Sequence, residues 1–203
     1  MDSVRVDQLE KEFDVSIDWV PYELHPEIPK EGVPRDQVLP PAYRAQAEQG
    51  VRRLGSEVGL TLHHHERLIN SRPALQAAEF ARSKGRFAPM HRALFQAYWD
   101  EGVDVSELGV LRQLAERAGV DPEAMAKSVE ADDYGDYLDA RRAEAEDLMI
   151  SGIPAHVIAD RYLVMGAQPY QVFERVMNQL AVLRRVSGET PLPPGSPAPP
   201  PGG

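Results

Sequence analysis

The chain of 203 residues contains no cysteine. It can therefore form no disulfide bond, supply no thiolate nucleophile and bind no metal through a thiolate ligand. It also has no apolar run near the roughly 20 residues that cross a bilayer. Positive charge is in deficit, with 22 Lys and Arg against 32 Asp and Glu and a net charge of −10. This balance argues against a nucleic-acid partner and against an anionic membrane surface.

Several other signals are missing. Acidic residues appear at once in place of the apolar stretch of a signal peptide, so we expect a cytoplasmic protein. Glycine-rich phosphate loops and Ser/His/Asp nucleophile motifs are not found. The run His63-His64-His65 does not share one face of a helix or a strand, so it indicates a solvated loop, and we expect no metal.

The chain does contain many helical patterns around a few short β segments. Apolar spacing, caps and terminators predict helices at 3–13, 41–58, 70–83, 87–100, 107–118 with Ser106 as cap, 122–130, 134–150 and 169–185. Leu148 in the seventh of these, and Leu183 in the last, are expected to face inward. Residues 15–20 alternate apolar and polar side chains, which predicts a half-buried strand.

Two short apolar runs near the C-terminus predict a β-hairpin. Residues 157–158 and 162–165 flank a polar turn, and Pro169 then opens a helix. Residues 187–203 are mostly Pro, Gly and Ser and predict a disordered tail. The order α, β, many helices, β-β-α favours an α/β core with a helical insertion. We expect the core at 1–29 and 148–186, the insertion at 30–147 and the tail at 187–203.

The sequence around the hairpin resembles a known family. Gly152-Ile153-Pro154 before it, and Val164-Met165-Gly166-Ala167-Gln168-Pro169 at its end, resemble the C-terminal end of DsbA-like thioredoxin-fold oxidoreductases. The run from Trp19 to Glu27 is similar to the second strand of their FrnE-type branch. More distant relatives are 2-hydroxychromene-2-carboxylate isomerases and kappa-class glutathione transferases. The resemblance covers about residues 3–185.

The resemblance implies an α/β protein with a thioredoxin-like core, an inserted α-helical domain and the first strand missing. It also implies thiol–disulfide oxidoreductase or isomerase activity on a thiol or disulfide substrate. In this family the proline is cis and the residue before it pairs with the substrate, so Ile153 and Pro154 are the expected substrate-binding residues. The alternative is an ordinary trans strand-entry proline, since only about one X-Pro bond in twenty is cis.

Two further residues have competing interpretations. Asn70 matches an Asn that, in the glutathione-using branch, helps to hold the substrate; its alternative is a helix-capping role. His156 follows the proline closely and is either a structural histidine or an acid/base group.

The family's first strand and its Cys-x-x-Cys loop have no counterpart in this sequence, because Met1 falls at the first turn of the first expected helix. Residues 15–20 and the hairpin would then lie on either side of a gap about one strand wide in the sheet. Backbone N–H and C=O groups facing this gap would be unpaired, at a cost on the order of 1–3 kcal/mol each. Three explanations stay open: a true start further upstream, a partner strand that closes the sheet, or a resemblance that fails at this end.

These considerations leave no confirmed catalytic residue, and we expect the chain as given to be inactive in thiol exchange. One alternative is a glutathione-dependent isomerase or transferase-like protein, with glutathione as its only cofactor. Another is a non-catalytic peptide-binding or protein-binding module that uses the groove by Pro154 or the sheet edges, with a homodimer among the expected partners.

Overall fold

The computed structural model describes residues 2–38, 40, 42, 49–50, 53, 55–56, 62–63 and 65–185. The chain divides into two units, residues 1–19 with 154–203, and residues 20–153. We call the first the core unit and the second the helical unit. The helix expected over 41–58 falls mostly outside the described residues, and the tail at 187–203 falls wholly outside them. The expected domain boundaries at 29/30 and 147/148 stay predictions.

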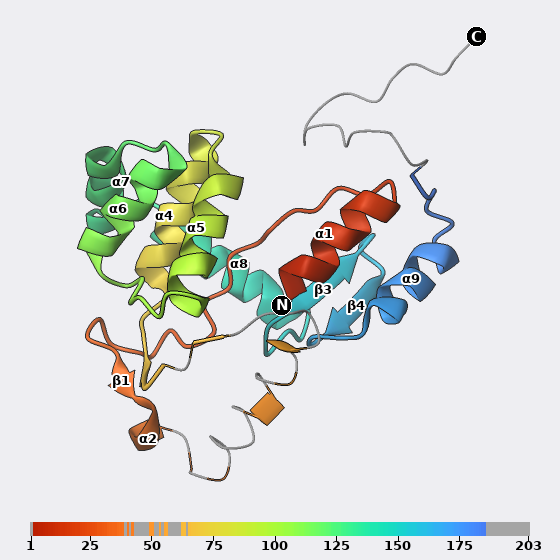
Figure 1. Cartoon of the computed structure of the whole chain (residues 1–203), viewed down its shortest axis with the longest axis horizontal. Coiled ribbons are helices and arrows are strands. Elements are labelled where there is room, and N and C mark those ends of the chain that lie inside the picture. Colours follow the sequence, from red (N-terminus) through yellow and green to blue (C-terminus); the bar gives the residue numbers. More distant parts are fainter. Residues whose placement is uncertain are drawn as a thin grey trace. The chain divides into compact units, whose positions relative to one another are not determined.

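The described part of the core unit contains two helices and one β-hairpin (Figure 1). The helices are α1 (Asp2–Glu12) and α9 (Tyr170–Gln179), and the strands are β3 (Ala155–Ile158) and β4 (Tyr162–Met165). The strands are antiparallel, from Ala155 opposite Met165 to Ile158 opposite Tyr162. This confirms the predicted hairpin and the predicted first helix.

The two helices and the hairpin share one small core. Its buried side chains are Leu9, Phe13, Val164, Phe173, Val176 and Met177. Ile158 and Tyr162 pack against it, so one face of the hairpin is turned toward the helices. Because side chains alternate along a strand, the pair Val157–Leu163 lies on the other face, where these residues are 45% and 42% exposed.

Residues 184–185, near the end of the described core unit, contact the C-terminal end of α1. Phe13 and Arg184 form an isolated antiparallel bridge. The Arg185 side chain donates through Nε to the backbone oxygens of Glu10 (3.0 Å) and Phe13 (2.9 Å). The Arg184 guanidinium lies over the Phe13 ring, 4.7 Å from its centroid. These contacts fasten residues 184–185 to the C-terminal end of α1 and satisfy carbonyls that the helix leaves without an internal partner.

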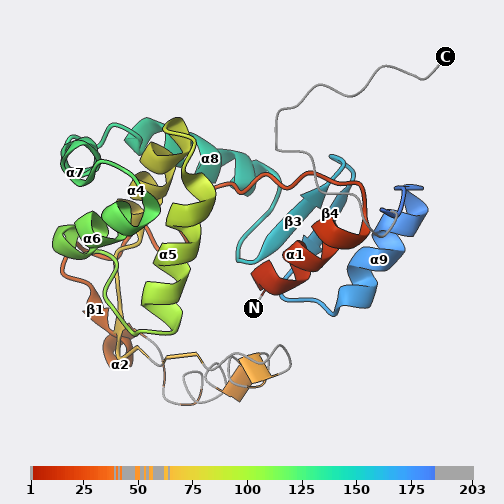
Figure 2. The same ribbon diagram turned by 45° about the horizontal axis from the view of Figure 1, so that its top comes forward.

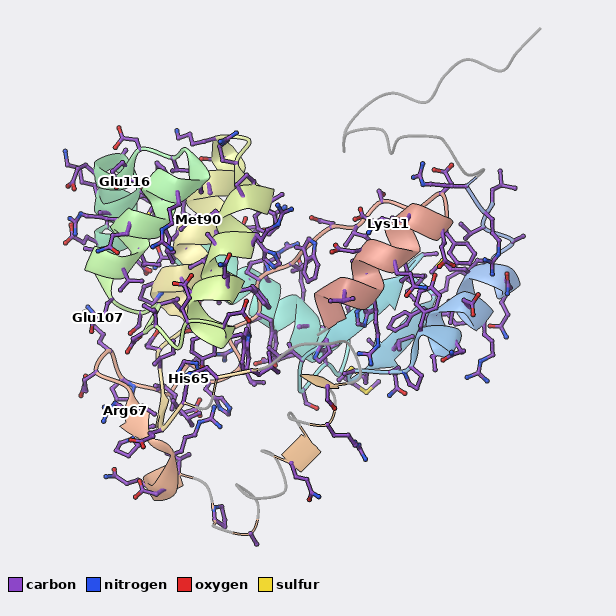
Figure 3. All side chains as sticks on the ribbon, in the orientation of Figure 1. Lys11, His65, Arg67, Met90, Glu107 and Glu116 are labelled. Carbon is purple, nitrogen blue, oxygen red and sulfur yellow. The ribbon has the colours of Figure 1, made fainter. Side chains whose placement is uncertain are left out.

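In the helical unit, the helices labelled α4 to α7 pack against one another (Figure 2). They are α4 (Arg72–Ser83), α5 (Phe87–Trp99), α6 (Leu108–Ala118) and α7 (Pro122–Glu130), and α8 (Gly135–Asp147) follows. Their apolar faces form one core that includes Met90, Leu111 and Met125, all 0% exposed. Figure 3 labels Met90 among these helices. Among the described residues, no helix is long and apolar enough to span a bilayer.

A smaller substructure precedes the helices. It contains β1 (Val33–Pro34), α2 (Arg35–Val38) and β2 (Arg67–Leu68). The two short strands are antiparallel, with Val33 opposite Leu68. No strand was predicted at 33–34 or 67–68, so these two-residue strands are additions to the prediction.

The start of α7 and the end of α6 follow local rules for helix ends. Asp121 caps α7, accepting from the backbone N–H groups of Glu123 and Ala124. Gly119 ends α6 in the left-handed conformation, φ 71°. Ser106 was expected to cap α6, but this prediction is wrong, because Glu107 occupies the N-cap position. The Ser106 hydroxyl instead donates to Asp104 Oδ1 at 2.6 Å.

Three expectations about individual segments are wrong. Residues 15–20 alternate between half-buried and exposed, as predicted, but they belong to neither of the two described sheets. Leu148 is 50% exposed, because α8 ends at Asp147 and the helical face stops there. Leu183 is 75% exposed, because α9 ends at Gln179 and Ala181 has φ 53°.

Candidate functional site

The Ile153–Pro154 peptide joins the helical unit to the core unit. The Ile153 side chain is 55% exposed, and Pro154 is half-buried. The Pro154 carbonyl accepts from the backbone N–H of Gly166 at 2.8 Å, which extends the hairpin beyond Ala155. A proline has no N–H to lose from a ladder, so the start of β3 tolerates it. The cis geometry and the substrate role of these two residues stay predictions.

The residues before Ile153 are held from two sides. The Ile150 N–H donates to the Ala145 carbonyl at 2.8 Å, and its side chain is only 9% exposed. The Ile150 carbonyl accepts from the Tyr22 hydroxyl at 3.3 Å. Ile150 is therefore an anchor, and the three residues that lead to Pro154 start from a fixed point.

Next to Tyr22, Glu23 enters a cluster of charges around Arg72. The Glu23 carboxylate is 4% exposed and lies 3.1 Å from Arg72 Nη1. Arg72 also pairs with Asp139 of α8 (2.9 Å) and with Asp132 (3.3 Å), which follows α7. The hydrogen bond to Asp139, then those to Asp132 and Glu23, raise the pKa of Arg72 against the effect of burial. Arg72 in turn lowers the pKa of Asp139.

This cluster connects the start of α4 to the segment that reaches the Ile-Pro peptide. Arg72 holds Glu23, and the adjacent Tyr22 holds Ile150. The sequence alone does not predict this connection. Its signal in the sequence is weak, since Glu23 and Arg72 are 49 positions apart and each could be a surface charge.

Asn70 is engaged at both ends of its amide. Its Nδ2 donates to the Ile28 carbonyl at 2.6 Å, and its Oδ1 accepts from the backbone N–H of Arg72 at 2.9 Å. The second contact satisfies one of the free N–H groups in the first turn of α4, as a capping side chain does. The structure thus shows a structural role for Asn70, and a substrate role stays a prediction.

His156 lies on the side of β3 that faces the helices. Its ring stands edge-on to the buried Phe173 ring, with centroids 4.8 Å apart and planes at 77°. Its Nδ1 is 3.4 Å from the Val164 carbonyl of the neighbouring strand. These contacts support the structural interpretation of this histidine.

Two of the three consecutive histidines contact the last residues of α5. His65 stacks on Tyr98, with ring centroids 3.9 Å apart, and its Nε2 is 2.7 Å from the Tyr98 carbonyl. The His63 N–H donates to the Trp99 carbonyl at 2.6 Å. Burial lowers the pKa of His65. Figure 3 shows His65 and Arg67 in the part of the unit that holds β1 and α2.

His64 lies outside the described residues. Within the described part of the chain, no cluster of three or more His, Asp or Glu side chains could hold a metal.

Comparisons with known proteins agree with this architecture. Residues 3–178 match the sequence profile of the DSBA-like thioredoxin domain. The chain is 23% identical over 170 residues to the uncharacterised protein YwbO of Bacillus subtilis, which covers 81% of this chain and 82% of YwbO.

Two solved structures are also similar. A Streptomyces coelicolor protein described provisionally as a DsbA oxidoreductase has a TM-score of 0.77 and 26% identity, over 95% of this chain and 86% of that one. A Nitrosomonas europaea protein described provisionally as a protein disulfide isomerase has a TM-score of 0.59 and 20% identity, over 70% and 76% of the two chains. The second likeness is one of fold.

Proposed function

Because the chain belongs to the DsbA-like thioredoxin-domain family, we propose that it is a thiol–disulfide oxidoreductase or isomerase of the FrnE-type branch. The observation that carries the proposal is the family match over residues 3–178, with an exposed Ile153 directly before Pro154 at the first strand of the hairpin. The substrate is a thiol or disulfide that pairs with the Ile153 backbone in an extended conformation. The protein works in the cytoplasm.

The chemistry requires a thiolate that this chain does not contain. In thiol–disulfide exchange a thiolate attacks one sulfur of a disulfide, forms a mixed disulfide and expels the other sulfur as a thiolate. We propose that this thiolate belongs to a Cys-x-x-Cys loop and strand that precede α1 in the native protein. Residues 1–203 alone are then inactive in exchange.

The test compares three proteins in an insulin-reduction assay. They are the chain alone, the chain with an N-terminal strand and Cys-x-x-Cys loop, and that extended chain with Pro154→Ala. We expect no exchange above background from the first, exchange from the second, and at least a tenfold loss in the third. Pro169→Ala, at the start of α9, serves as the matched control.

Two results would contradict this proposal. Exchange by the chain alone would refute its inactivity, and full activity of the Pro154→Ala protein would refute the role of the Ile-Pro peptide. The mass of the protein from its native source tests the extension separately, since a mass of 22.6 kDa would exclude a preceding segment. Calorimetric binding of glutathione to the unextended chain would favour the alternative, a glutathione-dependent isomerase or transferase.

The free edge of β3 favours a second candidate, a peptide-binding or protein-binding module. Among the described residues, β3 pairs with β4 alone. Along β3, residues whose backbone groups bond to β4 alternate with residues whose backbone groups point away from it. Because Pro154 accepts from Gly166 of the other strand, the N–H and C=O groups of Ala155 and Val157 point away from β4. An extended segment, including that of a second copy, could pair with this edge.

Val157→Pro tests this candidate because it removes an outward N–H and leaves the bonds to β4 in place. If the edge binds a second copy, sedimentation of the unaltered chain shows a dimer and the variant is monomeric. A monomer at all concentrations in both proteins would exclude pairing between copies.

A further inference from the structure

Residues 151–153 form a short link to Pro154 that packing barely restrains. Ser151 is exposed, Gly152 has no side chain to pack, and Ile153 is 55% exposed. Three residues span at most about 10–11 Å, so the contacts that hold the two ends of this link also limit where its backbone can lie. The position of Ile153, the residue that would pair with the substrate, therefore depends on those end contacts.

Tyr22 supplies the contact at the start of the link. Its hydroxyl donates to the Ile150 carbonyl at 3.3 Å, across 128 positions of sequence. The Ile150 N–H donates to the Ala145 carbonyl at 2.8 Å, which is a bond local to the end of α8. The bond from Tyr22 thus ties the start of the link to a second part of the helical unit. At the other end, within the core unit, the Pro154 carbonyl accepts from the Gly166 N–H at 2.8 Å.

The backbone beside Tyr22 is fixed in turn by an ion pair. The neighbouring Glu23 carboxylate is 4% exposed and lies 3.1 Å from Arg72 Nη1. Arg72 also pairs with Asp139 of α8 at 2.9 Å. The segment that presents the Tyr22 hydroxyl is therefore attached both to the start of α4 and to the helix whose end leads into the link. A hydroxyl on an attached segment can hold a carbonyl in place, whereas one on a free loop would move with it.

We propose that Tyr22 is a positioning residue for Ile153, because its hydroxyl holds the Ile150 carbonyl and so keeps the link ordered for pairing with a thiol or disulfide substrate. The inference rests on the proposed function, in which the substrate pairs with the Ile153 backbone. Ordering a mobile segment at the moment of binding costs free energy that an ordered segment does not lose. Removal of the hydroxyl should therefore weaken substrate binding and leave the rate at saturating substrate nearly unchanged.

The first test introduces Tyr22→Phe, which removes the hydroxyl and keeps the ring, into the chain extended by the strand and Cys-x-x-Cys loop. Turnover of a peptide that contains one disulfide is followed with dithiothreitol as the reductant. The hydrogen bond can restrain the link by no more than its own net free energy, so KM should rise about two- to tenfold while kcat stays within about twofold. A variant that merely had fewer folded molecules would show a lower kcat and an unchanged KM.

Ser83→Ala is the matched control. It also removes one hydroxyl bond in the helical unit, from Ser83 to the Phe80 carbonyl at 2.7 Å near the end of α4. Its KM should equal that of the unaltered extended chain.

A second readout uses residues 1–203 without the extension. Backbone ¹⁵N relaxation of the Ile153 amide should give an order parameter in the rigid range of about 0.85 for the unaltered chain and for Ser83→Ala. In Tyr22→Phe it should fall toward the flexible range below about 0.6.

Several results would overturn the inference: an unchanged KM in Tyr22→Phe, an equal rise of KM in Ser83→Ala, or an unchanged order parameter at Ile153. A lower kcat with an unchanged KM would assign Tyr22 to folding alone and would overturn it as well. Absence of exchange by the unaltered extended chain would instead refute the proposed function, and the order parameter would still decide whether Tyr22 holds the link. The two failures are therefore distinguishable.

Discussion

Replacing Arg72 with Met should leave a buried carboxylate without its cation. Glu23 is 4% exposed and Arg72 is 24% exposed, and their pair is 3.1 Å long. Removal of one partner from a buried ion pair costs about 3–5 kcal/mol. The pairs with Asp132 and Asp139, whose side chains are 56% and 62% exposed, add at most about 1 kcal/mol each. We therefore expect a loss of about 3–5 kcal/mol in the free energy of unfolding of the helical unit.

Urea denaturation followed by circular dichroism measures this loss. A double-mutant cycle with Glu23→Gln isolates the pair, because the neutral amide removes the uncompensated charge. We expect the double variant to be more stable than Arg72→Met alone. Arg112→Met is the matched control, since Arg112 forms a 2.9 Å pair with Glu123, which is 67% exposed. That variant should lose less than about 1 kcal/mol.

The result that would refute this reasoning is equal stability of Arg72→Met and Arg112→Met. The pair with Glu23 would then contribute no more than a surface ion pair. A second readout follows from the position of Glu23 beside Tyr22, which holds Ile150. Hydrogen exchange of the Ile150 amide should become faster in Arg72→Met and stay unchanged in Arg112→Met.

Three shorter predictions concern other parts of the molecule. Burial lowers the pKa of His65 in the folded protein. The contribution of the neutral ring to the free energy of unfolding is therefore complete above the unfolded pKa of about 6.5, and it is lost as pH falls through the folded pKa. His65→Phe should flatten the fall in stability between pH 7 and 5, measured by urea denaturation. Asp121→Ala removes the acceptor for two N–H groups of α7 and should lower the unfolding free energy by about 0.5–2 kcal/mol, whereas Asp121→Asn should lose less. Hydrogen peroxide should oxidise Met149 before Met90, Met125 or Met177, because only the first is exposed; peptide mass mapping that finds a buried methionine oxidised first would contradict the assigned exposures.

Periodicity predicted the helices because burial of one face is a local property of the sequence. Val6, Leu9 and Phe13 have the i, i+3, i+7 spacing of one helical face, and all three are at most 3% exposed. Asp121 and Gly119 marked helix ends through their own side-chain and backbone chemistry. The same reasoning failed where it ran past such an end, as at Leu148 and Leu183.

Other features depend on partners that a local pattern does not specify. Residues 15–20 show the alternation of a strand, but a strand also needs a neighbouring strand beside it, and these residues are part of neither described sheet. The Glu23–Arg72 pair joins residues far apart in sequence. Met149, just after the end of α8, is 85% exposed and has φ 59°, and the apolar spacing of the helix specifies neither. Of the candidate site, the Ile-Pro peptide could be identified from the sequence, whereas the contacts that hold it could not.

The attachment of residues 184–185 to the end of α1 has a consequence for synthesis on the ribosome. The helical unit is continuous in sequence and can fold while translation proceeds, since domains fold as units in the order in which they emerge. The core unit cannot do so, because α1 is made before the helical unit and α9 after it. Leu9 and Phe13 must therefore wait until the hairpin and α9 have been made before Val164, Phe173 and Val176 cover them. During that interval the nascent chain presents an uncovered apolar segment, and a chaperone that binds such segments would have its longest opportunity there.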